Sequence, residues 1–324
     1  MPYFKAKIAI LLIGIFFLAG CSLPKSSIID NASDKLEEKT QNKLQENLKE
    51  DVYILFVGDL MFDRSIREFT NRKGNDFIFE KISDFLKGND LVVANLEGPI
   101  TDNKSVSVGT TPGQKGHFIF TFDKSLADTL AKNNIKLVSL GNNHVLNFGV
   151  DGLDQTKKYL TENGIDYFGD PKNKENNSIV KEINGIKIGL VNYNQFGGIS
   201  VEEVNKNIEM LRNTVDIVVI YAHWGKEYEK NPSDKIKNLA HNFVDAGADL
   251  IIGSHPHVVQ NMEEYKGKRI YYSLGNFIFD QYFSAETMNG LAVRIKIDAE
   301  NRSMEFQEIP LIMERNGQTK PVSN

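Results

Sequence analysis

The sequence has a single cysteine, Cys21, among its 324 residues. Without a second cysteine there is no disulfide framework, so stability has to come from an apolar core. Basic residues are not in excess either, because 38 Lys and Arg face 43 Asp and Glu, a formal net charge of −5. We find no concentrated basic stripe and no internal repeat, and we therefore expect no nucleic-acid partner.

The remaining composition, with 41% hydrophobic and 25% charged residues, is typical of a soluble globular protein with a sizeable core. Histidine is scarce, with six residues in the chain. Two of them nevertheless lie one residue apart in Gly253-Ser-His-Pro-His257. Such a pair has three interpretations: a chance surface pair, a buried hydrogen-bonded pair, or two metal ligands.

The N-terminus carries one short, strongly apolar run. Lys5 and Lys7 precede it, and it ends in Leu-Ala-Gly-Cys at 18–21. A positive segment followed by a run too short for a comfortable membrane span is typical of a signal peptide. The last four residues resemble a bacterial lipobox, and that resemblance implies a signal peptide at 1–20 and a lipid on Cys21. An ordinary signal peptide or an uncleaved helix is the alternative.

Residues 21–50 are polar and rich in Lys, Glu, Asn and Ser, which favours a flexible tether. The lipobox and tether together predict an extracytoplasmic protein anchored to the cell membrane by its lipid. No linker-like break follows residue 50, so 51–324 is expected to be one domain.

Short β-branched runs alternate with amphipathic segments beyond the tether. Buried strands are expected at 52–58, 91–96, 135–141, 186–193, 216–223 and 249–255. Helices are expected at 79–88, 123–134, 150–163, 200–213 and 233–247. This alternation predicts an α/β fold with mostly parallel strands covered on both faces. Asn184-Gly185 and Lys266-Gly267 predict two hairpins that add antiparallel strands. One four-layer α/β/β/α sandwich fits best.

Five predicted strands end in side chains with metal or proton chemistry: Asp59, Glu97, Asn143 with His144, His223, and His255 with His257. Ligands bind at the carboxyl edge of open α/β sheets, so these groups are expected to converge. Carboxylate, amide and imidazole groups are ligands of Mn, Zn or Fe. We therefore predict a site for one or two divalent ions, in which Glu97 could bridge a two-metal centre that activates water.

Each of these side chains also has a structural alternative: a cap for Asp59, a solvated turn for Glu97, a turn for Asn142 and Asn143, and core packing for His223. His117 and His241 are expected to lie outside the site. The polar stretch 102–116 reads as a mobile loop or as a lid beside the site. At the histidine pair, an extended backbone would place both rings on one face, and Pro256 favours extended geometry at His255.

Six motifs occur in order: GDLMFDR (58–64), NLEGPI (95–100), SLGNNHVLNFG (139–149), YAHWGKEY (221–228), GSHPH (253–257) and YSLGNFIFDQ (272–281). Together they resemble the CapA family of capsule or poly-γ-glutamate synthesis proteins, whose domain resembles calcineurin-like metallophosphoesterases. The resemblance covers about residues 52–281. It implies a metallophosphoesterase-like sandwich.

The same resemblance implies a role for each site residue. Asp59 and His257 would hold the first metal, with Glu97 bridging. The second metal would be held by Asn143, His223 and His255, and His144 would be the acid or transition-state stabiliser. Asn276, Asp280 and Trp224 are candidates for substrate binding.

Two positions depart from the phosphoesterase pattern. Met61 stands where that superfamily has a histidine, and Glu97 replaces an aspartate. A thioether is a poor ligand for hard divalent ions. The first metal site therefore has one ligand fewer, unless Asp63 substitutes for the missing one.

The expected function is capsule or poly-γ-glutamate synthesis or export, with metal-dependent hydrolysis of a phosphoester or amide in an anionic substrate. A capsule synthase or export complex is the expected partner. One alternative is a non-catalytic subunit of a membrane complex that binds polymer, which Met61 favours. The other is a general phosphodiesterase or phosphatase of the cell envelope.

Overall fold

The computed structural model describes residues 50–322, in which two β-sheets pack face to face. The first sheet has the order β14-β13-β12-β1-β2-β3-β4, and β11 pairs with β1 outside this path. Its strands are β1 (Val52–Leu60), β2 (Leu91–Leu96), β3 (Ile135–Ser139), β4 (Asp166–Phe168), β11 (Asn276–Ile278), β12 (Asn289–Ile297), β13 (Met304–Met313) and β14 (Thr319–Pro321). Strands β1 to β4 are parallel, and β12 to β14 are antiparallel additions.

The second sheet has the order β5-β6-β7-β8-β10-β9. Its strands are β5 (Ser178–Ile183), β6 (Ile186–Asn194), β7 (Ile217–His223), β8 (Leu250–Ser254), β9 (Met262–Tyr265) and β10 (Lys268–Tyr271). The four central strands are parallel, and the edge strands β5 and β9 are antiparallel to their neighbours. All six predicted strands are confirmed, with ends within about two residues of those expected.

Both predicted hairpins are also confirmed. Asn184 and Gly185 join β5 to β6, and Lys266 and Gly267 join β9 to β10. The four residues have φ values of 50°, 74°, 51° and 73°. Positive φ at both central positions is what a two-residue type I′ turn requires, and it suits the twist of the flanking strands.

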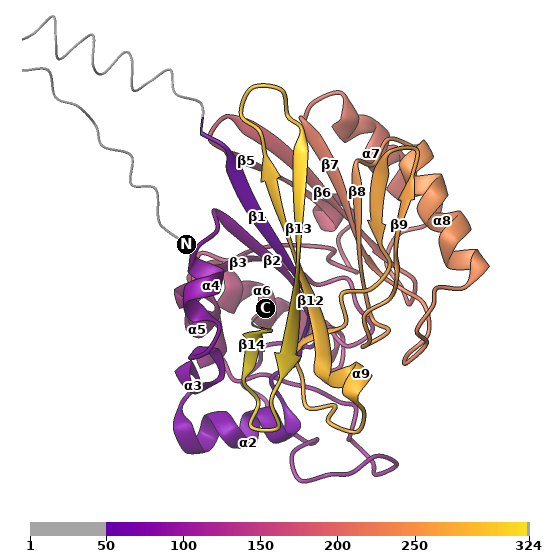
Figure 1. Cartoon of the computed structure of the whole chain (residues 1–324). Coiled ribbons are helices and arrows are strands. Elements are labelled where there is room, and N and C mark those ends of the chain that lie inside the picture. The colour runs from indigo at the N-terminus through magenta and orange to yellow at the C-terminus, as the bar shows by residue number, and fades with distance from the viewer. Residues whose placement is uncertain (1–49, 323–324) are drawn as a thin grey trace, which may run out of the picture. The chain divides into compact units, whose positions relative to one another are not determined.

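The helices cover the two outer faces of the paired sheets (Figure 1). They are α2 (Arg64–Lys73), α3 (Asp76–Phe79), α4 (Ser83–Lys87), α5 (Ser125–Lys132), α6 (Gly149–Glu162), α7 (Val201–Arg212) and α8 (Asp234–Asp245). The short helix α9 (Ala285–Met288) directly precedes β12, and a 3₁₀ turn lies at Lys174–Asn177. Ser200 begins α7 with a capping box to Glu203, and the Ser233 hydroxyl caps α8.

Three apolar clusters separate the layers. One joins α2 to α6 with the first sheet, one lies between the sheets, and one joins α7 and α8 with the second sheet. The inner cluster interleaves alternate residues of the two sheets, such as Ile54 and Phe56 with Val219 and Tyr221. The predicted four-layer α/β/β/α sandwich is thus confirmed.

One predicted helix is wrong. The segment 79–88 contains the end of α3, a break, and then α4. Ile82 has φ −127°, outside the helical region, and this turn lets Phe79, Ile82 and Leu86 all pack into the same cluster. Burial of three apolar side chains outweighs helix propensity here.

The described residues all belong to one compact unit, Lys49–Asn324. The predicted signal peptide, the lipidation site Cys21 and nearly all of the predicted tether lie outside the described residues. Within residues 50–322, none of the helices has the length and apolar character needed to cross a membrane.

Candidate metal centre

The predicted site residues lie at the carboxyl ends of strands from both sheets. Asp59 is the last residue but one of β1, His223 ends β7, and Glu97 immediately follows β2. Asn143 and His144 follow β3, and His255 and His257 follow β8. Because the two sheets pack with these ends on the same side, one network of polar contacts connects them.

A buried group of two carboxylates and one imidazole lies at the centre. Asp59, Glu97 and His257 offer ligand atoms within 4.8 Å of one another. His257 Nδ1 lies 3.4 Å from Asp59 Oδ2, and His257 Nε2 lies 3.5 Å from Glu97 Oε1. His144 Nε2 lies 3.9 Å from the same Glu97 oxygen. The His255 amide donates to Asp59 Oδ2 over 3.1 Å.

A second set of contacts brings together the residues predicted for the second metal. His223 Nε2 lies 2.8 Å from Asn143 Oδ1, and the rings of His223 and His255 are 4.8 Å apart between centroids. The structure thus places all six predicted ligands and His144 around one centre, although their roles stay predictions.

Asn95 links the two sets and was not singled out from the sequence. Its Nδ2 donates to Asp59 Oδ1 over 2.8 Å and lies 3.3 Å from His223 Nδ1. Asn142 donates to Asn95 Oδ1, and its own Oδ1 accepts from the amides of His144 and Val145. The one available signal was a polar residue, Asn95, inside the otherwise apolar β2.

Asn276 sets the tautomer of His257. The Asn276 Nδ2 donates to the backbone oxygens of His257 and Thr287 and to Gln281 Oε1, so its Oδ1 is the atom that faces the imidazole. That oxygen lies 2.9 Å from His257 Nδ1 and can only accept a hydrogen bond. The hydrogen therefore resides on Nδ1, and Nε2 presents its lone pair to Glu97.

The same argument assigns His144. The Phe120 amide donates to Asn147 Oδ1, which identifies that atom as the oxygen, and it lies 3.1 Å from His144 Nδ1. His144 therefore carries its hydrogen on Nδ1. Burial lowers the pKa of His144 to about 4, although the Asn147 bond opposes that effect. At neutral pH its Nε2 is an acceptor.

His223 and His255 are neutral as well. Burial, followed by the neighbouring His257, lowers the pKa of His255 to about 4. Burial, followed by His255, lowers the pKa of His223 well below its usual range. Burial in the first place, and then Asp59, raises the pKa of Glu97. Neutral imidazoles are the form that binds metal, and the positive charge of Arg64 does not offset the effects of burial and Asp59 on Glu97.

The donor set fits a divalent cation. Among the described residues, Glu97 Oε1 and His255 Nδ1 are buried without a hydrogen-bond partner. Buried polar atoms left without partners are costly and rare. Both atoms belong to the predicted ligand set, so a bound cation would satisfy them.

The backbone of the histidine pair differs from the extended geometry expected for it. His255 has φ +93° and His257 has φ +57°. Their rings still converge, with centroids 6.0 Å apart, but through a left-handed turn. Positive φ at two bulky residues costs on the order of 1–3 kcal/mol each, a form of strain that clusters at functional sites.

Met61 does not face the site as a ligand. It is fully buried, and its sulfur accepts from the Asp63 amide over 3.0 Å. Asp63 does not substitute for it either, because its carboxylate caps α2 and binds Arg67 and the Thr121 amide. Asp63 therefore does not supply the ligand that the first metal site lacks at position 61.

Two of the three residues predicted to bind substrate have buried side chains that are engaged within the protein. Trp224 has no exposed surface, and its indole donates to the Tyr272 carbonyl within the core. Asn276 lies behind His257 and has its amide fully occupied. Asp280 accepts from Arg64 and from the Ser65 amide at the edge of a pocket of about 630 Å³. A substrate contact by Asp280 stays a prediction.

That pocket adjoins the centre through Glu227, and the 102–116 loop forms another part of its wall. The loop is anchored, since Ser107 is fully buried and Thr110 Oγ1 lies 2.9 Å from His117 Nδ1. His117 in turn contacts Arg64 and lines the pocket, so it lies nearer the site than expected. His241 is elsewhere, stacked on Tyr265 and bonded to Glu263.

Fold and site together define a four-layer α/β/β/α protein with a candidate metal centre at the strand ends. Residues 53–281 match the family described as "Bacterial capsule synthesis protein PGA_cap", and the chain belongs to that family. The resemblance found in the sequence is thereby confirmed.

The chain is 31% identical over 312 residues to the capsule biosynthesis protein CapA of Bacillus anthracis, with 87% of this chain and 72% of that protein covered. It is 32% identical over 247 residues to the PGA biosynthesis protein CapA of Bacillus subtilis (strain 168), covering 70% of this chain and 63% of that protein. Among solved structures, TT1561 of Thermus thermophilus has a TM-score of 0.43 and 11% identity, covering 80% of this chain and 99% of that one.

Proposed function

We propose that this protein is an extracytoplasmic, lipid-anchored component of capsule synthesis or export. Its sandwich domain would be a metal-dependent hydrolase that acts on a phosphoester or amide bond of an anionic polymer such as poly-γ-glutamate. Membership of the capsule synthesis family supports the biological role. The lipobox-like segment that ends at Cys21 supports the anchor.

The hydrolase proposal depends on one observation. Asp59, Glu97 and His257 place ligand atoms within 4.8 Å of one another in a buried site where Glu97 Oε1 has no partner among the described residues. By the family resemblance these residues would hold the first ion, and Asn143, His223 and His255 the second. A bound divalent ion supplies an activated water and positive charge for a developing oxyanion.

The chain's own residues would orient the reaction. His144 presents the lone pair of Nε2 to the site, and Asn147 holds the ring by its Nδ1. In this state His144 can accept a hydrogen bond or a proton from a water. To protonate a leaving group it would first have to become cationic, which its lowered pKa of about 4 opposes.

A second candidate function is supported by Met61, whose buried thioether leaves the first metal site one ligand short. In that case the protein would be a non-catalytic subunit that uses the same cleft to bind polymer. A general phosphodiesterase of the envelope would instead turn over simple diesters and have no effect on capsule.

The test uses the full chain purified in detergent, treated with chelator and then loaded with Mn²⁺. We expect at least one tightly bound ion and hydrolysis of poly-γ-glutamate or of a chromogenic phosphodiester. Both the binding and the turnover should be lost in His257→Ala, and the turnover alone in His144→Ala. Absence of any bound transition metal would overturn the hydrolase proposal. Bound metal without turnover, together with capsule loss in a deletion strain, would favour the non-catalytic subunit.

A further inference from the structure

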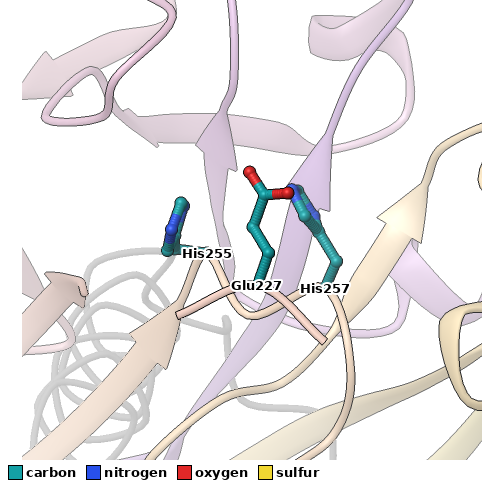
Figure 2. Close-up of side chains that lie close together, drawn as sticks. All are labelled: Glu227, His255 and His257. Carbon is teal, nitrogen blue, oxygen red and sulfur yellow. The ribbon is translucent and has the colours of Figure 1, made fainter. Parts of the chain in front are cut away.

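Glu227 lies beside the histidine pair, on the open side of the centre. Its carboxylate and the imidazoles of His255 and His257 offer ligand atoms within 4.8 Å of one another. Figure 2 shows the Glu227 side chain rising between the two rings, with its carboxylate directed at His257. No role for this residue follows from the strand-end pattern, because it lies four residues beyond β7 in a loop.

The backbone holds Glu227 in this position. The Trp224 amide donates to the Ser254 carbonyl over 3.2 Å, and the Tyr228 amide donates to the Pro256 carbonyl over 2.8 Å. Tyr228 itself adopts φ +65°, an uncommon value for a bulky residue. Two bonds therefore fasten the loop that carries Glu227 to the turn that carries both histidines.

The charge on Glu227 is not neutralised by its neighbour. Lys226 pairs with Glu229 over 2.8 Å instead. Arg64, the cation that acts on the nearby Glu97, is itself paired with Asp280. Glu227 thus adds a third carboxylate to Asp59 and Glu97, on the other side of His257, which both groups of ligand atoms share. Like charges this close are unfavourable without a cation.

The neighbouring histidine supplies an independent observation. His255 is 4% exposed, and its Nδ1 has no hydrogen-bond partner among the described residues. His257 has only Nε2 free, since Asn276 occupies Nδ1. A nitrogen without a hydrogen-bond partner, a nitrogen fixed as an acceptor and a carboxylate without a salt bridge among the described residues are thus gathered in one group.

We propose that Glu227 is a metal ligand, which binds the cation held by His257 Nε2 on the side of that ion that faces His255, the imidazole assigned to the second ion. It would supply the ligand that Met61 does not provide. An imidazole with the carboxylates of Asp59, Glu97 and Glu227 suits Mn²⁺, Fe²⁺ or Zn²⁺. Glu227 also lines the pocket of about 630 Å³, so this ion would face an anionic substrate entering from there. The inference rests on the metal centre of the proposed function.

The experiment compares Mn²⁺ binding to the full chain and its variants by titration calorimetry and by Mn²⁺ electron paramagnetic resonance. We expect Glu227→Gln to raise the Kd for Mn²⁺ at least about tenfold and to change the spectrum of the bound ion. Glu229→Gln is the matched control, because it removes a carboxylate two residues away that pairs with Lys226, and it should change neither quantity.

Glu227→Asp separates ligation from mere attraction, because it keeps the charge and withdraws the carboxylate by one methylene. A ligand role predicts weakened binding in Glu227→Asp as well, whereas wild-type affinity in this variant would overturn the inference. So would an unchanged Kd in Glu227→Gln. Melting of each metal-free variant reports on folding independently of binding. If the wild-type chain binds none of Mn²⁺, Fe²⁺ and Zn²⁺, the proposed hydrolase fails together with the inference. If the wild-type chain binds metal and the Glu227 variants bind it equally well, only the inference fails.

Discussion

Asn276 Oδ1 lies 2.9 Å from His257 Nδ1, and this contact decides which nitrogen of the ring faces the carboxylates. Asn276 begins β11, which pairs in parallel with β1 so that Asn276 lies opposite Asp59. A short additional strand thus places a side chain behind the histidine, where it fixes the ring's orientation and its tautomer. Such supporting groups around a metal ligand commonly matter almost as much as the ligand itself.

Asn276→Ala is therefore expected to raise the Kd for Mn²⁺ about 10- to 100-fold. The ring loses its acceptor and the preference for hydrogen on Nδ1. The variant should also be less stable, because the Thr287 carbonyl and Gln281 lose a donor. Titration calorimetry measures the affinity, and urea unfolding in EDTA measures the stability.

Asn133→Ala is the matched control for this prediction. Asn133 is also a buried asparagine with a backbone hydrogen bond, but it ends α5 just before β3, at the opposite end of that strand from Asn143. The Asn133→Ala variant should be less stable than the wild type and should bind Mn²⁺ with the same affinity. Equal affinity in Asn276→Ala and Asn133→Ala would refute a positioning role for Asn276.

Glu97→Gln is predicted to stabilise the protein in EDTA and to destabilise it in Mn²⁺. The folded state raises the pKa of Glu97 through burial, and then through Asp59. Above pH 4.5 the unfolded chain releases this proton while the folded protein retains it, so wild-type stability falls as pH rises. Glutamine has no proton to lose, and it leaves the Asn95 contact in place.

The stability difference in EDTA should consequently grow with pH, by about 1.4 kcal/mol for each pH unit until the raised pKa is passed. Urea unfolding of both proteins at pH 5, 6.5 and 8 measures it. With Mn²⁺ present the order should reverse, because the wild-type carboxylate then binds the ion. If Glu97→Gln is less stable than wild type in EDTA at every pH, other groups of the protein already stabilise the negative charge of Glu97 without metal.

Much of the fold and the composition of the site could be read from the sequence, because both depend on local patterns. Buried strands such as 91–96 are continuous apolar runs, and a polar residue after such a run must lie at a strand end. Asp59, Glu97 and His223 were found in this way. The alternation of strands and helices predicts parallel strands, whose carboxyl ends lie at one edge within each sheet.

What could not be read depends on contacts between distant segments. The sequence motif around Asn276 suggested substrate binding, but only the pairing of β11 with β1 places it behind His257. Trp224 follows His223 directly, yet it points to the opposite side, into the core. Glu227 has no periodic signal, because its position depends on two hydrogen bonds between loops.

Gly253→Ala is expected to disrupt the centre from within β8, two residues before His255. A Cβ at this position would lie 2.0 Å from the Tyr272 carbonyl oxygen and 2.8 Å from the Trp224 Nε1. Both atoms belong to buried residues, and the Tyr272 oxygen is a backbone atom that already accepts from Trp224. The end of β8 must therefore shift, at a cost of about 1–3 kcal/mol. Because the left-handed turn of His255 and His257 begins there, metal affinity should fall as well. Urea unfolding in EDTA and Mn²⁺ titration measure the two effects.

Gly88→Ala is the control for Gly253→Ala, since its added Cβ would meet nothing closer than 3.5 Å. It should change neither the stability nor the Mn²⁺ affinity. Unaltered Mn²⁺ affinity in a measurably destabilised Gly253→Ala would mean that the histidine turn is positioned independently of the strand that precedes it.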